Sequence, residues 1–592
     1  MHKSMKKIFF FLLALSLFLT GYTQKAITIK ILETSDVHGS ILPFDYINNK
    51  PAEASLAQVF TYVKQERANT NQHVLLFDNG DILQGQPTVY YSNFIDSLNQ
   101  NIVSQVFNFM GYNTASVGNH DIETGPKVYN KVRKEFDFPW LAANAVNESD
   151  GKPYFVPYTT FQKEGVKIVV LGLITPGIPH WLPKNLWPKM RFESMINSAK
   201  FWVDKIKQQE KPDIIIGLFH SGHDAKYGGQ NPDDTLNENS SQLIAQQVPG
   251  FDVILIGHDH DQFNKKVVNI KGDSVLILDP LAGARFISEA TIKVNLDQQG
   301  KITSKSISGK LIDTKLYAPD SAFMVKFNDY SKSVETFVNR KIADFTESTS
   351  TKDSYFGPSS FIDFIHTAQL SISKADISFT APLSFSTYIG KGPVYVRDMF
   401  KLYKFENFLY VMNLTGAEID SYLEYSYSHW YNTMKGSEDH LIKFKLNGDQ
   451  TLELKKDGKV QLESNYYNFD SAAGINYTVD VSKPDGDKVI IHSMADGTPF
   501  DLNKTYRIAT SSYRGNGGGG HLSKGCGLSA EQINSRLVFS TDKDIRFYLM
   551  KWIEEKKVIT PKSLNLWNVI PADWVKIASD RDRALMFGAK QE

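Results

Sequence analysis

The stretch NTASVGNHD, residues 113–121, places three polar side chains directly behind a short apolar segment. Asn119, His120 and Asp121 follow Gly118, so an amide, an imidazole and a carboxylate stand in succession where a buried strand is expected to end. In layered α/β proteins, ligands collect at the carboxyl ends of the strands. The stretch therefore predicts a strand of an α/β sheet and a binding site at the end of that strand.

The same design recurs through the first half of the chain. AITIKILETSDVHG, HVLLFDNGD, DIIIGLFHSGHD and DVILIGHDH each combine an apolar, β-branched run with a polar ending that contains glycine. Helical stretches separate these segments through about residue 315, which is typical of a layered α/β architecture. Because ligands gather at strand ends in such folds, we expect these endings to converge although they are distant in sequence.

The expected strand ends carry only oxygen and imidazole donors. The donor residues are Asp36, His38, Asp81, Asn119, His120, His220, His258 and His260. This mixture suits divalent ions of the Zn, Mn, Fe or Co type, whereas Ca and Mg sites depend mainly on oxygen. A single D-x-H or H-x-H motif is more often a capped turn or a solvated pair. The chain has 14 histidines, and the gathering of several of them at strand ends favours a metal site.

Length and composition limit the possible classes of protein. A chain of 592 residues exceeds what one hydrophobic core usually serves, so two or more domains are expected. Hydrophobic residues at 42% and charged residues at 22% describe a globular chain, which excludes general disorder. Lys plus Arg equals Asp plus Glu at 65 each, so no overall charge attracts a nucleic acid polymer.

The first residues, MHKSMKKIFFFLLALSLFLTGYTQ, have the anatomy of a signal peptide over residues 1–23: a basic start, an apolar run and a small, polar ending. The apolar run is shorter than the roughly 20 residues of a membrane span, so we expect no stable membrane anchor. A mature chain beginning near Gln24 and a periplasmic or secreted location are expected. Cys526 is the only cysteine, which excludes an intramolecular disulfide.

The composition and the predicted secondary structure change along the chain. Residues 24–318 carry the α/β pattern, and residues 319–349 are helical and charged, which predicts a connector. Residues 350–592 are rich in Tyr, Phe and Gly, and FKLNGDQTLELKKDGKVQLES (444–464) has the pattern of β-hairpins. A mixed α/β second domain is therefore expected.

In this order, DVHG, GD, GNHD, the first His of LFHSGH, and GHDH resemble the metallophosphoesterase signature. YNFDSAAGINYTVDVSKPDGDKV and YRIATSSYRGNGGGG resemble the C-terminal domain of the secreted 5'-nucleotidase and 2',3'-cyclic-nucleotide 2'-phosphodiesterase family. The resemblance extends over nearly the whole mature chain. It implies a metallophosphoesterase domain with a four-layer α/β/β/α sandwich, followed by a mixed α/β 5'-nucleotidase-type domain.

The resemblance also implies a ligand set for two divalent metal ions. One ion would be held by Asp36, His38 and His260, the other by Asn119, His220 and His258, with Asp81 bridging the two. Phosphate ester hydrolysis needs a nucleophile at neutral pH and compensation for charge on the phosphoryl oxygens, and a pair of metal ions supplies both.

His120 would stay off the metals and act on the leaving oxygen as a proton donor or by its charge. Glu123 follows three residues later and is expected to orient this imidazole, at a place where the family commonly has Asp. Two alternatives stay open at this point. Asp121 is a competing partner for His120, and Glu123 is equally compatible with a solvated carboxylate at a helix start.

The second domain is expected to select the substrate. The resemblance implies a nucleoside base stacked between two aromatic rings, with Tyr403 or Phe405 on one side and Tyr513 on the other. Asn407 belongs to the same pattern, and Arg514 is a candidate contact for phosphate or ribose, with a surface ion pair as the alternative. Each of these aromatic residues is also compatible with a place in the core.

One departure from the family bears on specificity. The 5'-nucleotidase branch typically has an arginine-containing segment where this chain has APLSFSTYIGKG (381–392). The lack of arginine favours the 2',3'-cyclic phosphodiesterase and 3'-nucleotidase branch, with a 5'-nucleotidase as the near alternative. The expected partner is a small-molecule nucleotide, and the pattern specifies no oligomeric state. Two further alternatives are a dimetal phosphatase or thiohydrolase acting on a non-nucleotide ester and a metal-free surface binding protein.

Overall fold

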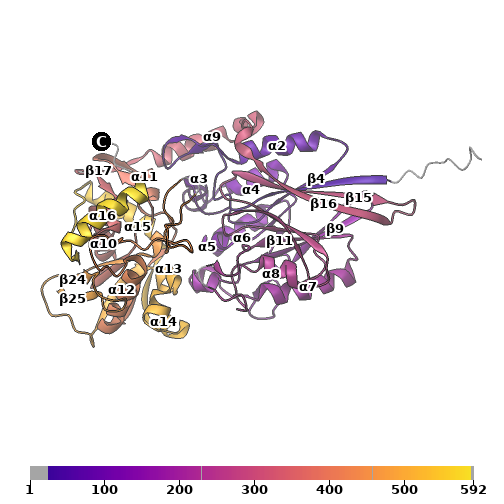
Figure 1. Cartoon of the computed structure of the whole chain (residues 1–592). Helices are drawn as coiled ribbons and strands as arrows, with labels where there is room; N and C mark the ends of the chain where they lie inside the picture. Colours follow the sequence, from indigo (N-terminus) through magenta and orange to yellow (C-terminus); the bar gives the residue numbers. More distant parts are fainter. Residues whose placement is uncertain (1–24, 228–229, 456–457, 589–592) are drawn as a thin grey trace, which may run out of the picture.

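The computed structural model describes residues 25–227, 230–455 and 458–588. The expected signal peptide at residues 1–23 lies outside the described residues. The chain forms two lobes, a first lobe up to residue 338 and a second lobe from residue 341, with helix α9 (Ser321–Val338) running along the top of Figure 1 between them.

The first lobe contains two six-stranded sheets, in the orders β16-β15-β1-β4-β5-β6 and β13-β14-β12-β11-β9-β8. The strands of the first sheet are β1 (Lys25–Thr34), β4 (His73–Asp78), β5 (Thr114–Ser116), β6 (Trp140–Leu141), β15 (Phe286–Leu296) and β16 (Ile302–Asp313). Those of the second are β8 (Tyr158–Lys163), β9 (Val166–Ile174), β11 (Ile214–His220), β12 (Val253–Ile256), β13 (Gln262–Val268) and β14 (Ser274–Pro280).

The central strands of each sheet are apolar on both faces, as expected of strands covered on both sides. Ile31 and Phe77 of the first sheet share one buried cluster with Leu218 and Leu255 of the second, which makes a hydrophobic layer between the sheets. Separate clusters join the outer faces to helices. The covering helices are α2 (Leu56–Ala68), α4 (Ile102–Met110) and α6 (Pro126–Glu135) on the first sheet, and α7 (Met195–Gln209) and α8 (Ser241–Gln247) on the second. The expected four-layer α/β/β/α sandwich is confirmed.

The strands that carry the predicted donors are neighbours. β1 pairs with β4 and β4 with β5, all in parallel, and β11 pairs with β12 in parallel in the other sheet. Their carboxyl ends therefore lie at one edge of each sheet, which brings segments from distant parts of the chain together.

The expected connector is not a free linker. The apolar face of α9, formed by Phe323, Phe327, Val334 and Val338, is buried in the core of the first lobe. Asp320 caps the helix by accepting a hydrogen bond from the backbone N–H of Phe323 at 2.9 Å. The strand that follows, β17 (Lys341–Phe345), already pairs within the second lobe. The chain thus crosses between the lobes over the two residues that separate α9 from β17.

The second lobe is a mixed α/β unit around a five-stranded sheet of order β23-β19-β26-β22-β27. Its strands are β19 (Ile377–Thr380), β22 (Phe408–Thr415), β23 (Ser471–Ala473), β26 (Thr505–Ser511) and β27 (Leu537–Asp544), and its longer helices include α10 (Ser360–Ser373), α12 (Gly416–Trp430) and α15 (Ile545–Lys556). The described residues of the 444–464 segment pair only through isolated bridges such as Phe444 with Leu462, not through full strands. None of the helices in the described ranges is both long and apolar enough to cross a bilayer.

Two histidines are buried in the second lobe. His366 on α10 lies with its ring nitrogens 3.0 Å from Ser378 Oγ and 3.1 Å from Ser471 Oγ. His521 is 1% exposed, and its ring packs beside Tyr422 without a hydrogen-bond partner for either nitrogen. Burial lowers the pKa of each imidazole to about 3.

Because of these two buried histidines, we expect the folded chain to become less stable in acid. An unfolded histidine binds a proton near pH 6.5, whereas these two stay neutral in the folded chain down to about pH 3. Their contribution to the free energy of unfolding is therefore complete above pH 6.5 and is lost as the pH falls. His366→Gln or His521→Gln is expected to reduce the pH dependence of the free energy of unfolding by about 1.4 kcal/mol per pH unit near pH 5.

Urea unfolding of the full chain at pH 7, 6 and 5 measures this change. The exposed His492→Gln variant is the matched control and should keep the slope of the unmodified chain. Equal slopes in all variants would contradict the prediction.

Candidate active site

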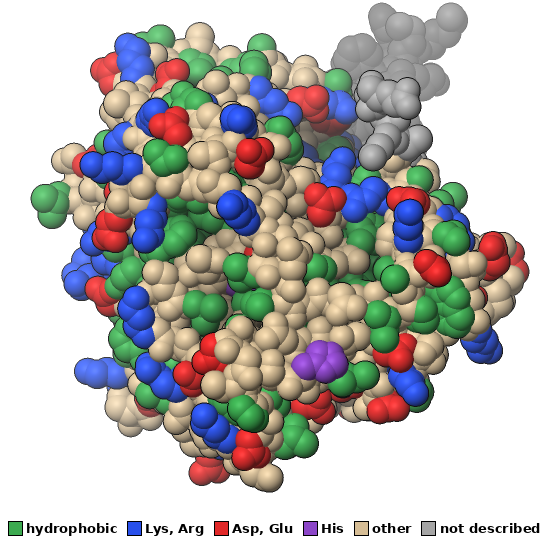
Figure 2. Space-filling model, turned by 90° about the vertical axis from the view of Figure 1, so that its left-hand side faces the viewer, with side chains coloured by type: hydrophobic (Ala, Val, Ile, Leu, Met, Phe, Trp, Pro, Cys, Tyr) green, Lys and Arg blue, Asp and Glu red, His purple; other side chains and the backbone are tan. Residues whose placement is uncertain are grey.

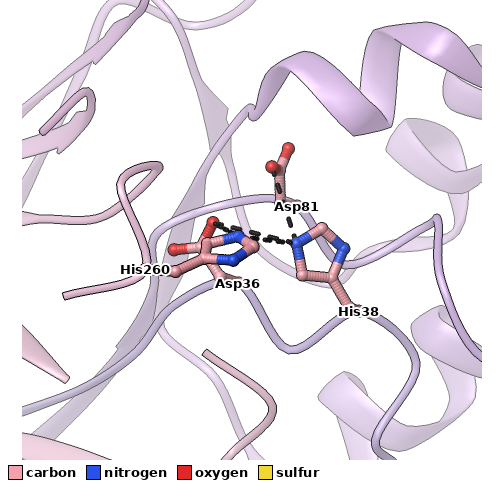
Figure 3. Close-up of side chains that lie close together, drawn as sticks. All are labelled: Asp36, His38, Asp81 and His260. Atoms are coloured by element: carbon pink, nitrogen blue, oxygen red, sulfur yellow. Dashed lines mark hydrogen bonds and ion pairs between the residues drawn. The ribbon is translucent and has the colours of Figure 1, made fainter. Parts of the chain in front are cut away.

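A first group of donors meets at the edge shared by the two sheets (Figure 3). It consists of Asp36, His38, Asp81 and His260, each of which can offer one ligand atom, with all four atoms within 4.8 Å of one another. His38 Nε2 lies 3.0 Å from His260 Nε2 and 3.9 Å from Asp81 Oδ2. His260 Nε2 lies 3.3 Å from Asp36 Oδ1. Three donors come from loops after strands of the first sheet, and His260 follows β12 of the second.

A second group contains Asp81 again, together with His220 and His258. His220 is the last residue of β11, and its Nε2 lies 3.2 Å from Asp81 Oδ2 and 3.0 Å from Asn119 Oδ1. The structure therefore brings together all the residues expected to bind metal, with Asp81 common to both groups.

Backbone carbonyls fix the tautomers of two of the histidines. His38 Nδ1 donates to Gln84 O at 3.1 Å, and His220 Nδ1 donates to Asn79 O at 2.6 Å. Because a carbonyl only accepts, Nδ1 carries the proton in both rings and the Nε2 lone pair faces the other donors. This arrangement is usual for imidazoles that bind metals.

The two carboxylate oxygens of Asp36 have different surroundings. Oδ2 accepts from Ser35 Oγ at 2.5 Å and from the His258 N–H at 3.0 Å, whereas Oδ1 is buried without a hydrogen-bond partner. Burial raises the pKa of this carboxyl, but the neighbouring His260 outweighs it and holds the pKa below its usual range. A buried charged oxygen without a hydrogen bond needs a cation beside it. The donors thus fit a pair of divalent ions.

Backbone geometry also singles out these positions. Five of the donor residues have a left-handed backbone: Asp36 (φ 50°), His38 (48°), Asp81 (57°), His258 (82°) and His260 (54°). Such a conformation costs a residue other than glycine about 1–3 kcal/mol and is concentrated at functional sites. Gly118 is required by close approach, because a Cβ there would lie 2.2 Å from Asp81 Oδ1.

Asp121 has a role that the sequence did not reveal. Its buried carboxylate accepts backbone N–H groups of Gly118 (2.8 Å), Asp81 (3.1 Å), Ile82 (2.9 Å) and Leu83 (3.0 Å). Burial and the charge of Asp81 raise its pKa to about 7, against the effect of these N–H groups. Asp121 is therefore tied to the loops that hold the donors and does not compete for His120.

His120 lies on the short helix α5 (Asn119–Glu123) beside the donors. Its Nδ1 is hydrogen-bonded to Glu123 Oε2, and its backbone N–H donates to Asp81 Oδ1 at 2.8 Å. The Glu123 side chain is only 5% exposed, so the contact with His120, and not solvation, accounts for this carboxylate. Burial lowers the pKa of His120, but the charges of Asp81 and Glu123 raise it to about 10. The two carboxylates therefore favour the protonated form of the imidazole.

A cavity of about 400 Å³ lies between the lobes, in the size range of small-molecule sites. Asp81, Asn119, His258 and His260 of the donor groups line it from the first lobe, together with His120. The second lobe contributes all five expected substrate residues, which are Tyr403, Phe405, Asn407, Tyr513 and Arg514, and several others, among them Lys404, Tyr466, Tyr467 and Asp470.

The expected aromatic residues differ in exposure. Phe405 and Tyr513 are half-buried and line the cavity. Tyr403 is 0% exposed and packs in a cluster with Leu409 and Ile545, so it has no free ring face for a ligand. Asn407 is 8% exposed and also borders the cavity. Of the two alternatives for the first ring, the geometry favours Phe405.

Arg514 has partners other than the expected phosphate, ribose or surface acid. Nε and one terminal nitrogen bind the two carboxylate oxygens of Asp470 at 3.0 and 2.9 Å. The remaining N–H groups bind Asn468 Oδ1, Gly518 O and Tyr467 O at 2.8–3.1 Å. All five N–H donors of a guanidinium are thereby used within the protein. Arg514 holds the segment around Asp470 against the glycine-rich loop.

Several cavity residues carried no signal in the sequence. Trp181, Leu182 and Glu238 of the first lobe lie in loops without periodicity or motif spacing. These residues are recognised only in the structure, where the two lobes meet around the cavity.

Comparison with known proteins gives two family matches. The calcineurin-like phosphoesterase family matches residues 29–262, and the 5'-nucleotidase C-terminal domain matches residues 340–524. A 2',3'-cyclic-nucleotide 2'-phosphodiesterase/3'-nucleotidase of Yersinia enterocolitica is 26% identical, over 94% of this chain and 91% of that protein. A trifunctional nucleotide phosphoesterase of Bacillus subtilis is also 26% identical over 92% of this chain, which spans only 39% of its length.

A solved Staphylococcus aureus protein assigned as a 5'-nucleotidase has the same two-lobe fold. The TM-score is 0.74 at 22% identity, and the match covers 92% of this chain and 99% of the other.

Proposed function

Since the chain belongs to the calcineurin-like phosphoesterases that carry a 5'-nucleotidase C-terminal domain, we propose that it hydrolyses phosphate esters of nucleotides with two bound divalent ions. The observation that carries this proposal is the meeting of two donor groups at Asp81, on the wall of a cavity that both lobes line.

The proposed ligands of one ion are Asp36, His38 and His260, and those of the other are Asn119, His220 and His258, with Asp81 shared. Zn, Mn, Fe or Co ions fit this mixture of imidazole nitrogen and oxygen. Such a pair of ions supplies an activated water and compensates charge on the phosphoryl oxygens. The complete donor set disfavours the alternative of a metal-free binding protein.

His120 is the proposed general acid. Its Nδ1 is held by Glu123, which leaves Nε2 to donate a proton to the leaving oxygen of the ester. Glu123 is a positioning residue in this scheme, because it fixes the ring and supports the protonated form.

Phe405 and Tyr513 are proposed to stack on the base, an interaction worth about 1–3 kcal/mol per ring. Asn407 would contact the base beside them. We propose a positioning role for Arg514 because its donors are already bound.

A preference for 2',3'-cyclic and 3'-nucleotides over 5'-nucleotides is proposed from the name of the Yersinia relative and from the lack of arginine in residues 381–392. Lys404 and Arg514 are the Lys and Arg residues that border the cavity in the described part of the chain. A 5'-phosphate therefore has few cations to meet outside the metal centre.

A substrate panel tests the proposal. With Mn or Zn present, kcat/KM is measured for 2',3'-cyclic AMP, 3'-AMP, 5'-AMP and the baseless ester p-nitrophenyl phosphate. The cyclic and 3'-nucleotides are expected to be the best substrates. A strong preference for 5'-AMP would contradict the proposed 2',3'-cyclic and 3'-nucleotide preference and favour a 5'-nucleotidase. Hydrolysis of the baseless ester alone would favour a non-nucleotide phosphatase.

We also propose that the chain acts outside the cytoplasm, on the pattern of residues 1–23. A small molecule is the proposed partner, and not a nucleic acid polymer. Basic and acidic side chains alternate over the face of the molecule in Figure 2, without a continuous basic surface on that face.

A further inference from the structure

An aromatic side chain of the first lobe lies beside the proposed metal centre. Trp181 follows the short helix η2 (Ile178–His180) in the loop that leads from β9 toward β10 (Met190–Phe192). It is half-buried and lines the cavity between the lobes. The centroid of its ring lies 5.6 Å from that of His258, and the two ring planes differ by 30°. The indole therefore forms an apolar wall of the cavity next to a proposed metal ligand.

Two contacts hold Trp181 in place. A Cβ at Gly177 would lie 2.6 Å from Trp181 Cη2, so the six-membered ring of the indole packs on backbone at a position where a larger residue would displace it. The Trp181 carbonyl accepts a hydrogen bond from Asn516 Nδ2 of the second lobe at 3.3 Å. Asn516 directly follows the helix α13 (Ser512–Gly515), which carries Tyr513. Trp181 thus connects the surroundings of His258 with the segment that is proposed to stack on the base.

The position of the phosphate decides which part of a nucleotide meets this wall. In 3'- and 2',3'-cyclic nucleotides the phosphate is attached through oxygen to ring carbons of the ribose, whereas in a 5'-nucleotide the C5' methylene group separates the ring from the phosphate. A phosphate held at the metal centre therefore brings the ribose of the first class next to that centre, where the indole lies. The C–H groups of the sugar are apolar surface that an aromatic side chain can cover.

We propose that Trp181 is a specificity-determining residue that packs on the ribose of 2',3'-cyclic and 3'-nucleotides, an inference that rests on the proposed nucleotide hydrolysis. The contact is smaller for a 5'-nucleotide, because its ribose lies farther from the metal centre. Recognition of the substrate then uses aromatic residues of both lobes, with Phe405 and Tyr513 of the second lobe on the base and Trp181 of the first lobe on the sugar.

Trp181→Ala tests this role on three substrates. For 2',3'-cyclic AMP and 3'-AMP, kcat/KM is expected to fall about 10- to 100-fold, the range for loss of an apolar contact in a binding pocket. For 5'-AMP it should change little. Trp181→Phe keeps an aromatic face and should recover most of the activity on the cyclic and 3'-nucleotides. Phe201→Ala removes an exposed aromatic side chain of the first lobe, and this matched control should behave like the unmodified enzyme on all three substrates.

Two further measurements separate contact with the ribose from support of His258. The metal content, from elemental analysis, and the inhibition constant of inorganic phosphate, which has no ribose, should both be unchanged in Trp181→Ala. Loss of metal, weaker inhibition by phosphate or equal losses on all three nucleotides would overturn the inference alone, and so would full activity of the variant on the cyclic and 3'-nucleotides. Hydrolysis of p-nitrophenyl phosphate without hydrolysis of any nucleotide by the unmodified enzyme would overturn the proposed function, and this inference with it.

Discussion

Replacing His120 with alanine is expected to lower kcat by about two to four orders of magnitude while the metal content is kept. The reason lies in the geometry: Glu123 holds the imidazole at the wall of the cavity, and His120 belongs to neither donor group. Steady-state kinetics with a nucleotide substrate and elemental analysis of the purified variant give the two quantities.

The leaving group separates proton donation from other effects of this variant. p-Nitrophenolate is stable as an anion and needs little protonation, so His120→Ala should lose much less activity on p-nitrophenyl phosphate than on a nucleotide. The exposed His492→Ala is the matched control and should match the unmodified enzyme. Loss of metal from His120→Ala would make this residue a ligand, and equal losses on both esters would contradict the acid role.

Replacing Asp81 with alanine is expected to remove bound metal and to lower kcat/KM by at least about three orders of magnitude. Its carboxylate is common to both donor groups, and Oδ2 lies 3.2 Å from His220 Nε2 and 3.9 Å from His38 Nε2. Loss of the shared ligand therefore affects both ions. Metal content and kcat/KM are measured on the same preparation.

Chelation supplies an independent measurement of the same centre. Ions that bind only the folded chain stabilise it, so EDTA should lower the Tm of the unmodified protein and have little effect on Asp81→Ala. Asp150→Ala, at an exposed turn, is the control and should respond to EDTA like the unmodified protein. An Asp81→Ala variant that keeps two metal equivalents and full activity would contradict the proposed centre.

The donors were predictable from sequence because each lies at the end of a buried strand or within a few residues after it. An apolar run that ends in Asp, Asn or His predicts its own position at a sheet edge, and parallel pairing then brings these edges together. Asp121 could not be assigned in the same way. Its partners at residues 81–83 belong to another strand end, and hydrogen bonds between two loops leave no periodicity in either.

The second lobe was less predictable for a different reason. Tyr403 and Phe405 are two positions apart in a loop beside the cavity, and only tertiary packing determines that the first is fully buried while the second is half-buried. Arg514 finds its carboxylate partner 44 residues away at Asp470, which no local pattern indicates. The helical character of α9 was predicted, but its burial against the first lobe depends on contacts with a distant core.

Each donor group takes members from both sheets of the sandwich. Asp36 and His38 belong with His260 across the gap, and Asn119 belongs with His220. The distance between the sheets is set by side chains such as Phe77 and Leu218, which belong to the buried cluster between them. The hydrophobic layer between the sheets therefore acts as a spacer, and a change of side-chain volume in that layer would alter the separation of the two donor groups.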